Sequence, residues 1–287
     1  MRGPLYLLIA TLLAALGWVA SKLVVEQMPG EVFIASRFLL ASLFLLPFCY
    51  KSLWRLRAKK IILASGTGSI LAIGLLIWVY AVSISNSLSE GAFIMSVAVI
   101  IAPMTAWIMF KVKPHKAFWV ALPISVIGMM LLSLSHGWEV ETSQGYFLLA
   151  SALMSVHFVL NKKLSSKLKP LDSICLQLFV VGIVAGIYSA VTHQVSFEWN
   201  DNLLFWFAIS TLIATSVRYL LQTIGQHQAK METAALIMIL EPIWTMILSV
   251  SFLDETVSVQ KIIGGAMIFI SLFLYIKLSK PAVKAAS

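Results

Sequence analysis

The sequence predicts an all-α membrane protein with ten transmembrane helices arranged as two inverted five-helix repeats. Composition gives the first indication, because 60% of the 287 residues are hydrophobic, only 11% are charged, and the mean hydropathy is +0.94. Water-soluble domains do not have this composition. The second indication is the pattern: mostly apolar stretches of about 20 residues, each long enough to cross a hydrocarbon core, follow one another along the chain. They leave no room for an extramembrane domain.

Charged segments separate the expected helices. The acidic residues Glu26 and Glu31 lie between the first two, and the basic segment 51–60 lies between the second and the third. The first helix begins almost at Met1 and has no small-residue cleavage site followed by a soluble domain, so we expect it to be retained rather than removed as a signal peptide. In chain order, the expected helices span 4–25, 31–50, 61–82, 90–110, 117–135, 144–161, 172–192, 203–225, 232–253 and 259–278.

The distribution of charge sets the expected orientation. With the N-terminus in the cytoplasm, all but four of the 21 Lys and Arg residues lie at the cytoplasmic end, and nine of the 12 acidic residues lie at the external end. The positive-inside rule requires this asymmetry. We therefore expect a multi-pass protein of the bacterial inner membrane with both termini in the cytoplasm. The net charge of +9 then reflects a basic face on anionic lipid, and no nucleic-acid partner is expected.

An internal repeat is suggested by sliding the chain along itself. A shift of 140 residues pairs Tyr6 with Tyr146 and Leu8 with Leu148, and a shift of 142 pairs Glu90 with Glu232 at corresponding helix starts. We therefore expect one repeat over 1–138 and a second over 143–287. Because five helices are an odd number, the second repeat must enter the membrane from the opposite side. Inverted repeats of this kind are typical of secondary transporters.

Several motifs resemble one family. The residues that carry the resemblance are Ser89-Glu-Gly-Ala-Phe-Ile-Met-Ser, Arg37-Phe38, Leu240-Glu-Pro-Ile-Trp, Phe252-Leu-Asp-Glu-Thr-Val-Ser and Ile263-Gly-Gly-Ala-Met-Ile. Over essentially the whole chain, this sequence resembles the EamA branch of the drug/metabolite transporter (DMT) superfamily. The resemblance implies ten helices in two inverted halves and export of amino acids or other small metabolites. The family usually has an acidic residue near the end of the fourth helix, where this chain reads Lys111-Val-Lys-Pro114.

Glu241 is the most informative polar residue, because it is the only charged residue between Thr233 and Leu253. Counted by helix rise from the cytoplasmic face, Glu241 lies roughly 13 Å deep, Arg218 roughly 10 Å and His157 roughly 7 Å. Glu241 either binds a substrate amine or a proton, or forms a permanent structural pair with Arg218. Pro242 cannot donate a backbone hydrogen bond, so we expect a helix kink beside the acid.

Other polar and aromatic residues have two readings each. His157 is either a second proton-coupling candidate or a satisfied bundle histidine. Arg37, near the external face and shallow enough to snorkel, either acts as an anchor or helix lock or captures a substrate carboxylate. Asn161 and Gln222 either form hydrogen bonds with a zwitterionic substrate or hold neighbouring helices together. The resemblance places five aromatic residues on helices that line the central cavity, where they form a pocket or lie at the membrane interface: Trp18, Trp78, Tyr80, Tyr219 and Trp244.

The function expected from these features is export of small metabolites by alternating access, most readily amino acids or related amphipathic zwitterionic compounds. A lipid-handling or non-transporting membrane scaffold protein is the alternative. No enzyme is expected, because we find no phosphate loop, metal-ligand spacing or catalytic triad. Cys49 and Cys175 lie in apolar helices, so we expect neither a disulfide nor a metal site, and no cofactor. The expected partners are a small-molecule substrate, the lipid bilayer and a coupling proton, with the protein a monomer or weak homodimer.

Overall fold

The fold was analysed in a computed structural model, which describes residues 2–111, 113–114, 116–133, 141–165, 167–192, 197–229, 237–238 and 240–278. Within these residues every regular element is a helix. We call α1 to α6 the first half and α7 to α13 the second half. The helices of the first half are α1 (Arg2–Val25), α2 (Gly30–Leu53), α3 (Ala58–Ile84), α4 (Leu88–Ser96), α5 (Ala98–Phe110) and α6 (Lys116–Ser133).

The second half contains a continuous helical run in which the winding changes. Between α9 and α10 lies the π-helical stretch η2, where the hydroxyls of Thr215 and Ser216 donate to carbonyls five residues earlier, Ser210 O at 2.8 Å and Thr211 O at 3.0 Å. The helices of this half are α7 (Thr142–Ser165), α8 (Pro170–Thr192), α9 (Asp201–Ala208), η2 (Ile209–Val217), α10 (Arg218–Gln228), α12 (Leu240–Leu253) and α13 (Val259–Leu278).

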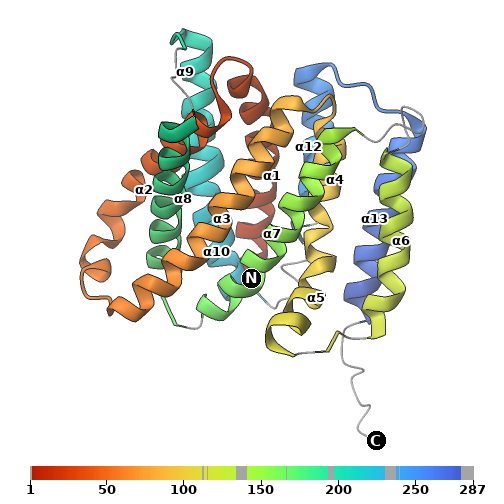
Figure 1. The fold of residues 1–287 in the computed structure, drawn as a ribbon. Helices are drawn as coiled ribbons and strands as arrows, with labels where there is room; N and C mark the ends of the chain where they lie inside the picture. The colour runs from red at the N-terminus through yellow and green to blue at the C-terminus, as the bar shows by residue number, and fades with distance from the viewer. Residues whose placement is uncertain are drawn as a thin grey trace, which may run out of the picture.

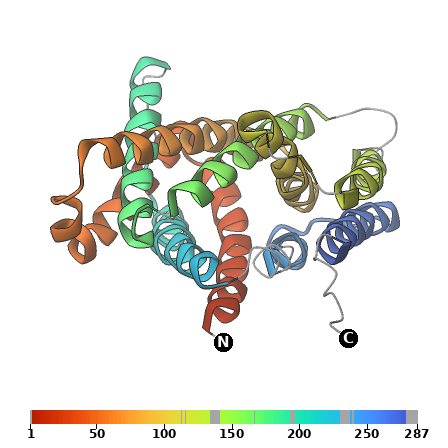
Figure 2. The ribbon, with the colours of Figure 1, turned by 90° about the horizontal axis from the view of Figure 1, so that it is seen from below.

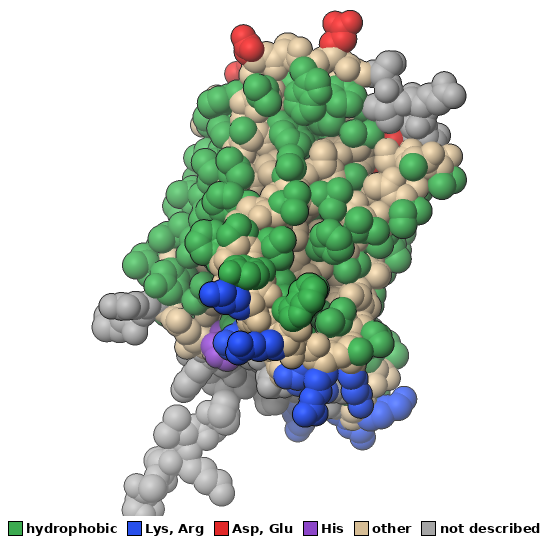
Figure 3. Space-filling view, turned by 90° about the vertical axis from the view of Figure 1, so that its left-hand side faces the viewer, with side chains coloured by type: hydrophobic (Ala, Val, Ile, Leu, Met, Phe, Trp, Pro, Cys, Tyr) green, Lys and Arg blue, Asp and Glu red, His purple; other side chains and the backbone are tan. Residues whose placement is uncertain are grey.

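The helices form an upright bundle (Figure 1). By length and composition, seven helices among the described residues are able to cross a membrane, and α12 is a shorter apolar helix. The space-filling view shows hydrophobic side chains around the middle, Lys and Arg at one end, and Asp and Glu at the other (Figure 3). We call these the basic end and the acidic end. An apolar belt between two charged ends is the surface that a bilayer requires.

Two expected helices differ from their predicted form. The fourth helix, expected over 90–110, is divided into α4 and α5 at Val97. The Val97 N–H donates a hydrogen bond to Ile94 O at 3.1 Å, and the Ser96 hydroxyl donates one to Phe93 O at 2.6 Å. The eighth, expected over 203–225, contains η2. The expected ninth helix began at residue 232, but 230–236 lie outside the described residues, as does the Glu232 used in the repeat comparison.

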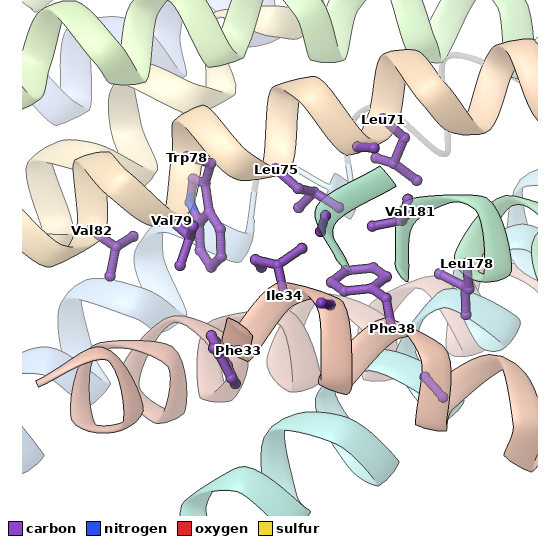
Figure 4. Close-up of a cluster of buried hydrophobic side chains, with 14 of the residues drawn as sticks. Phe33, Ile34, Phe38, Leu71, Leu75, Trp78, Val79, Val82, Leu178 and Val181 are labelled. Carbon is purple, nitrogen blue, oxygen red and sulfur yellow. The ribbon is translucent and has the colours of Figure 1, made fainter. Parts of the chain in front are cut away.

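Most helix packing joins the two halves. The helices α2 and α8 pack together, as do α6 and α13, α3 and α7, and α1 with both α10 and α12. Seen from below, α6 and α13 lie side by side at one edge of the bundle (Figure 2). The main core lies where α2, α3 and α8 meet, and Ile34, Phe38, Leu75 and Val181 point toward one another there (Figure 4).

Candidate functional site

A cavity of about 230 Å³ lies between the two halves. Its walls come from α1, α2, α3 and α4 of the first half and from α7, η2, α10 and α12 of the second. A water molecule takes about 30 Å³, so the cavity has room for a small organic molecule. Most of the residues singled out in the sequence line it: Trp18, Arg37, Trp78, His157, Arg218, Tyr219, Gln222, Glu241 and Pro242.

Glu241 brings a carboxylate to the cavity from the first turn of α12. The indole Nε1 of Trp18 donates a hydrogen bond to its Oε1 at 3.1 Å, and Nη2 of Arg218 lies 3.6 Å from its Oε2. Charge-assisted hydrogen bonds are usually shorter, at about 2.7–2.9 Å. The Arg218 and Glu241 side chains are 15% and 20% exposed. The ion pair expected from the sequence is therefore present, but it is loose and its carboxylate faces open space.

Two polar atoms of the cavity lining have no hydrogen-bond partner among the described residues. They are Nε of Arg218 and Oε1 of Gln222, and both are buried. The two residues are four positions apart on α10, so they share one face of that helix. One atom is a donor and the other an acceptor. Since buried polar atoms are normally satisfied, this wall is suited to a ligand that carries both kinds of group.

Aromatic rings form the wall on the side of α1 and α3. Trp18 and Trp78 meet edge to face with ring centroids 5.0 Å apart. On the opposite side, the guanidinium of Arg218 lies 4.3 Å from the centre of the Tyr219 ring. The cavity thus places the Glu241 carboxylate and the Arg218 guanidinium among aromatic surfaces, an arrangement that binds amphipathic molecules with charged groups.

Arg37 does not snorkel, and its contacts fit the helix-lock interpretation of the sequence. It is only 5% exposed, and it donates from Nε to the hydroxyl of Thr215 and from Nη1 to that of Ser21, the latter at 2.8 Å. Its guanidinium also lies 5.2 Å from the Phe33 ring. A buried guanidinium needs such partners, and the η2 stretch supplies one of them. Arg37 therefore joins α1, α2 and η2 while also lining the cavity.

His157 belongs to a polar chain that continues away from the cavity. Its Nε2 lies 2.8 Å from Oε1 of Gln177, whose Nε2 donates to Asn161 Oδ1 at 3.0 Å and to Ser173 Oγ at 2.8 Å. The chain joins α7 to α8. Asn161 is one helical turn nearer the basic end than His157 and does not line the cavity, so its contact with Gln177 favours the role of holding helices together.

Two of the aromatic residues expected in the pocket lie elsewhere. Tyr80 is 49% exposed and packs against Tyr146 with centroids 4.9 Å apart. It is two positions from Trp78, which in a helix with 3.6 residues per turn places it on nearly the opposite face. Trp244 does not line the cavity, and its buried Nε1 has no partner among the described residues. Pro242 lies in the first turn of α12, and residue 239 lies outside the described residues, so the kink expected beside Glu241 stays a prediction.

The sequence interpretation missed other lining residues and one charged cluster. Met95, Ser96, Met154, Phe158 and Gln226 also line the cavity, and nothing in their type distinguishes them from ordinary helix-packing residues. The charges Glu90, Glu255 and Lys261 were assigned to the external surface. In the structure Glu90 is 2% exposed and Lys261 5%. The signal for them was Lys261, one of only two lysines at an otherwise acidic end, because a cation there has a nearby acid as its natural partner.

No three His, Cys, Asp or Glu side chains of the described residues gather closely enough to hold a metal ion. Cys49 and Cys175 are both free and buried. The polar lining of the cavity thus consists of groups that bind by charge and hydrogen bonding.

Comparison with known proteins gives three similarities. The sequence model of the EamA-like transporter family matches residues 1–134 and again residues 143–277. An uncharacterized transporter of Archaeoglobus fulgidus is 24% identical over 276 residues, which cover 94% of this chain and 85% of that protein. A solved structure, described only as the crystal structure of a protein, superposes with a TM-score of 0.68 and 13% identity over 95% of each chain. At that identity the superposition shows the fold alone.

Proposed function

Because the chain belongs to the EamA-like transporter family, within the drug/metabolite transporter superfamily, and is a multi-pass membrane protein, we propose that it exports small metabolites by alternating access. The proposed substrates are amino acids or related amphipathic, zwitterionic compounds. The observation that carries the proposal is the cavity between the halves, where Trp18 of the first half and Arg218 of the second both contact Glu241. Family membership favours a transporter over an enzyme.

The proposed architecture is ten crossings in two inverted halves, over 1–138 and 143–287. Counted by crossing, the first half runs α1, α2, α3, α4 with α5, and α6, and the second runs α7, α8, α9 to α10, α12, and α13. The main packing pairs between the halves stay the same when the two halves are exchanged. The second crossing of one half packs against the second crossing of the other (α2 with α8), and the fifth against the fifth (α6 with α13). The third crossing of each half packs against the first crossing of the other (α3 with α7, α10 with α1), and so does the fourth crossing of each half (α5 with α7, α12 with α1). This pairing and the double family match support the inverted repeat.

We assign the basic end to the cytoplasm of a bacterium. Lys51, Arg55, Arg57, Lys59 and Lys60 all lie in or beside the turn between α2 and α3, and positive residues of short loops stay on the cytoplasmic side. Both termini then lie on the cytoplasmic side of the inner membrane. Export moves substrate from the basic end to the acidic end.

In the proposed binding mode, a substrate ammonium displaces Nη2 of Arg218 from Glu241. The gap of 3.6 Å between them leaves room for that exchange, while the Trp18 N–H holds the carboxylate in place. Arg218 then turns to the substrate carboxylate and uses its Nε donor, which has no partner among the described residues. An apolar side chain rests against Trp18, Trp78 and Tyr219. Glu241, with His157 as second candidate, carries a coupling proton when substrate is absent.

The test is solute counterflow in proteoliposomes. Purified protein should accelerate uptake of labelled amino acids into vesicles preloaded with the same compound. Glu241→Gln should abolish that uptake while the protein still folds, because the amide cannot balance an ammonium. Glu26→Gln, at an exposed site near the acidic end, is the matched control and should behave as wild type. Lipid scrambling without carriage of any solute in a broad screen would favour the lipid-handling alternative and end the transport proposal.

A further inference from the structure

A buried charged cluster closes the acidic end of the bundle, separate from the cavity. Nζ of Lys261 lies 3.0 Å from Oε1 of Glu90 and 3.9 Å from Oε1 of Glu255. The three side chains are 6% exposed or less. Gln144 donates from Nε2 to the second oxygen of Glu90 at 2.9 Å. Charges buried to this degree within membrane helices are costly and mark functional sites by default.

The cluster joins the two halves of the chain. Glu90 lies in the first turn of α4 in the first half, whereas Gln144 begins α7 and Lys261 begins α13 in the second. Glu255 reaches the cluster because Asp254, at φ 50°, turns the chain sharply after α12. Separating α4 from α7 and α13 would therefore break the contacts of Glu90 with both Lys261 and Gln144, while Lys261 would keep its contact with Glu255.

Movement of α4 would also open the cavity. Ala92, two positions after Glu90, lines the cavity and is 3% exposed. Between them, Gly91 is covered so closely by the Phe147 ring that an added Cβ would lie 2.6 Å from it. Phe147 in turn packs against Trp18 with centroids 5.7 Å apart. The layers from the cavity outward are thus Trp18, Phe147 and the charged cluster.

The two carboxylates of the cluster have different surroundings. Glu255 accepts hydrogen bonds from the hydroxyls of Ser87 and Ser89 and from the Ser89 N–H at the start of α4, at 3.3 Å for the N–H. A helix N-terminus stabilises such an anion. Glu90 pairs with Lys261 and accepts from Gln144, whose own Oε1 is buried and has no partner among the described residues. Two carboxylates share one ammonium, and an unused acceptor lies beside Glu90.

Two other charged groups near the cluster, in the part of the chain that the structure describes, have partners of their own. Lys22 of α1 donates to the carbonyls of Val82, Ser83 and Ser85, the last at 2.9 Å. Glu141, before α7, accepts from Ser143 at 3.1 Å and from Asn86 at 3.4 Å. Neither group contacts the cluster through these hydrogen bonds. A change of charge on Glu90 therefore alters its ion pair with Lys261 and its hydrogen bond with Gln144.

We propose that Glu90 is the proton-binding site of an external gate, in which its ion pair with Lys261 holds the acidic end closed and a proton from that side opens it. A protonated Glu90 no longer attracts Lys261, and its O–H can donate to Oε1 of Gln144 once that amide turns over. Lys261 keeps Glu255 as a partner. A proton therefore binds Glu90 more favourably when the gate is open than when Lys261 holds it closed, and this difference shifts the gate toward the open state. This inference rests on the proposed export function and adds an external gate that responds to pH, while the coupling proton stays with Glu241.

The first experiment tests pH control of transport with Glu90→Gln, which removes the carboxylate that binds the proton. Wild-type counterflow should change by about tenfold or more when the pH on the acidic side is varied, because a proton from that side opens the gate. Glu90→Gln counterflow should lack this dependence, whereas Glu26→Gln, at an exposed acid near the same end, should keep it. A Glu90→Gln protein whose counterflow follows the pH on the acidic side as wild type does would overturn the proposal.

The second experiment reads the gate without transport. Ala92→Cys is exposed to a membrane-impermeant maleimide from the acidic end, after Cys49 and Cys175 are replaced by Ala. Labelling should speed up as the pH on that side falls, and adding Glu90→Gln should make it fast, by about tenfold, and independent of pH. Lys261→Met removes the same pair from α13 and should also give fast labelling. Slow, pH-independent labelling in all three proteins would refute the gate. Absence of counterflow in wild type would refute the transport function while leaving this measurement readable.

Discussion

Gly182 of α8 lies against α2 so closely that the smallest side chain should disturb the fold. A Cβ at this position would lie 2.5 Å from Cγ of Leu39 and 2.8 Å from the Leu39 backbone nitrogen. Carbon atoms in contact normally lie about 3.5–4.0 Å apart, so either α8 or α2 must move by about 1 Å. In membrane bundles, small residues are what permits such close helix approach. We therefore predict that Gly182→Ala destabilises the protein.

Gly186 provides the matched control one turn later on the same helix. The nearest atom to an added Cβ there is Cβ of Ala35, at 3.9 Å, an ordinary contact. Replacing Gly by Ala inside a helix gains about 0.8–1 kcal/mol in both variants, so this gain cancels in the comparison. Overpacking typically costs about 1–3 kcal/mol. Gly182→Ala should therefore be less stable than Gly186→Ala by about 1–3 kcal/mol.

The assay is thermal unfolding of both variants in one detergent, followed by tryptophan fluorescence. At roughly 2–4 °C per kcal/mol for chains of about this size, Gly182→Ala should melt several degrees below Gly186→Ala. Gly186→Ala should melt at or above wild type. If Gly182→Ala melts as high as Gly186→Ala, then α2 and α8 do not approach as closely as described, and the reasoning from their packing fails.

Three further predictions concern the cavity. Trp18→Phe keeps a ring beside Trp78 but removes the N–H that holds Glu241. Because a hydrogen bond to a charged group is worth about 1.5–3 kcal/mol, substrate affinity measured by ligand-induced thermal shift should fall about tenfold or more. Unchanged affinity would exclude this role of Trp18. Tyr80→Leu, on the outer face of α3, should leave counterflow unchanged while Trp78→Leu impairs it, and equal effects would show that both rings reach the substrate. Arg37→Met should lower stability by about 2–3 kcal/mol through its lost hydrogen bonds, with KM unchanged if Arg37 only joins helices and raised if it also captures a substrate carboxylate.

The membrane class and most helix positions could be predicted because they depend on local properties. A run of about 20 apolar residues must be a helix in lipid, since the backbone has no other way to satisfy its polar groups there. The same reasoning identified Glu241, because a lone carboxylate in an apolar run requires an explanation. Its partner Arg218 followed from similar depth on successive helices, and the structure places the two 3.6 Å apart.

The internal breaks were harder to predict. The end of α4 at Ser96 and the π-helical η2 depend on single hydrogen bonds, from Ser96 to Phe93 and from Thr215 to Ser210. A hydropathy pattern averaged over many residues does not resolve these, because serine and threonine satisfy backbone carbonyls in ordinary helices as well.

Sequence alone thus determined which segments enter the membrane, which end is basic, and which few residues are costly enough to need a purpose. Only the tertiary structure decided what each of them faces. Arg37 is buried against Ser21 and Thr215 rather than snorkelling, Tyr80 points away from the cavity that Trp78 lines, and Glu90 meets Lys261 across 171 positions of the chain. Helix rise gives the depth of a residue, but rotation about the axis and the choice of neighbouring helix depend on packing between distant segments, and no local pattern records that packing.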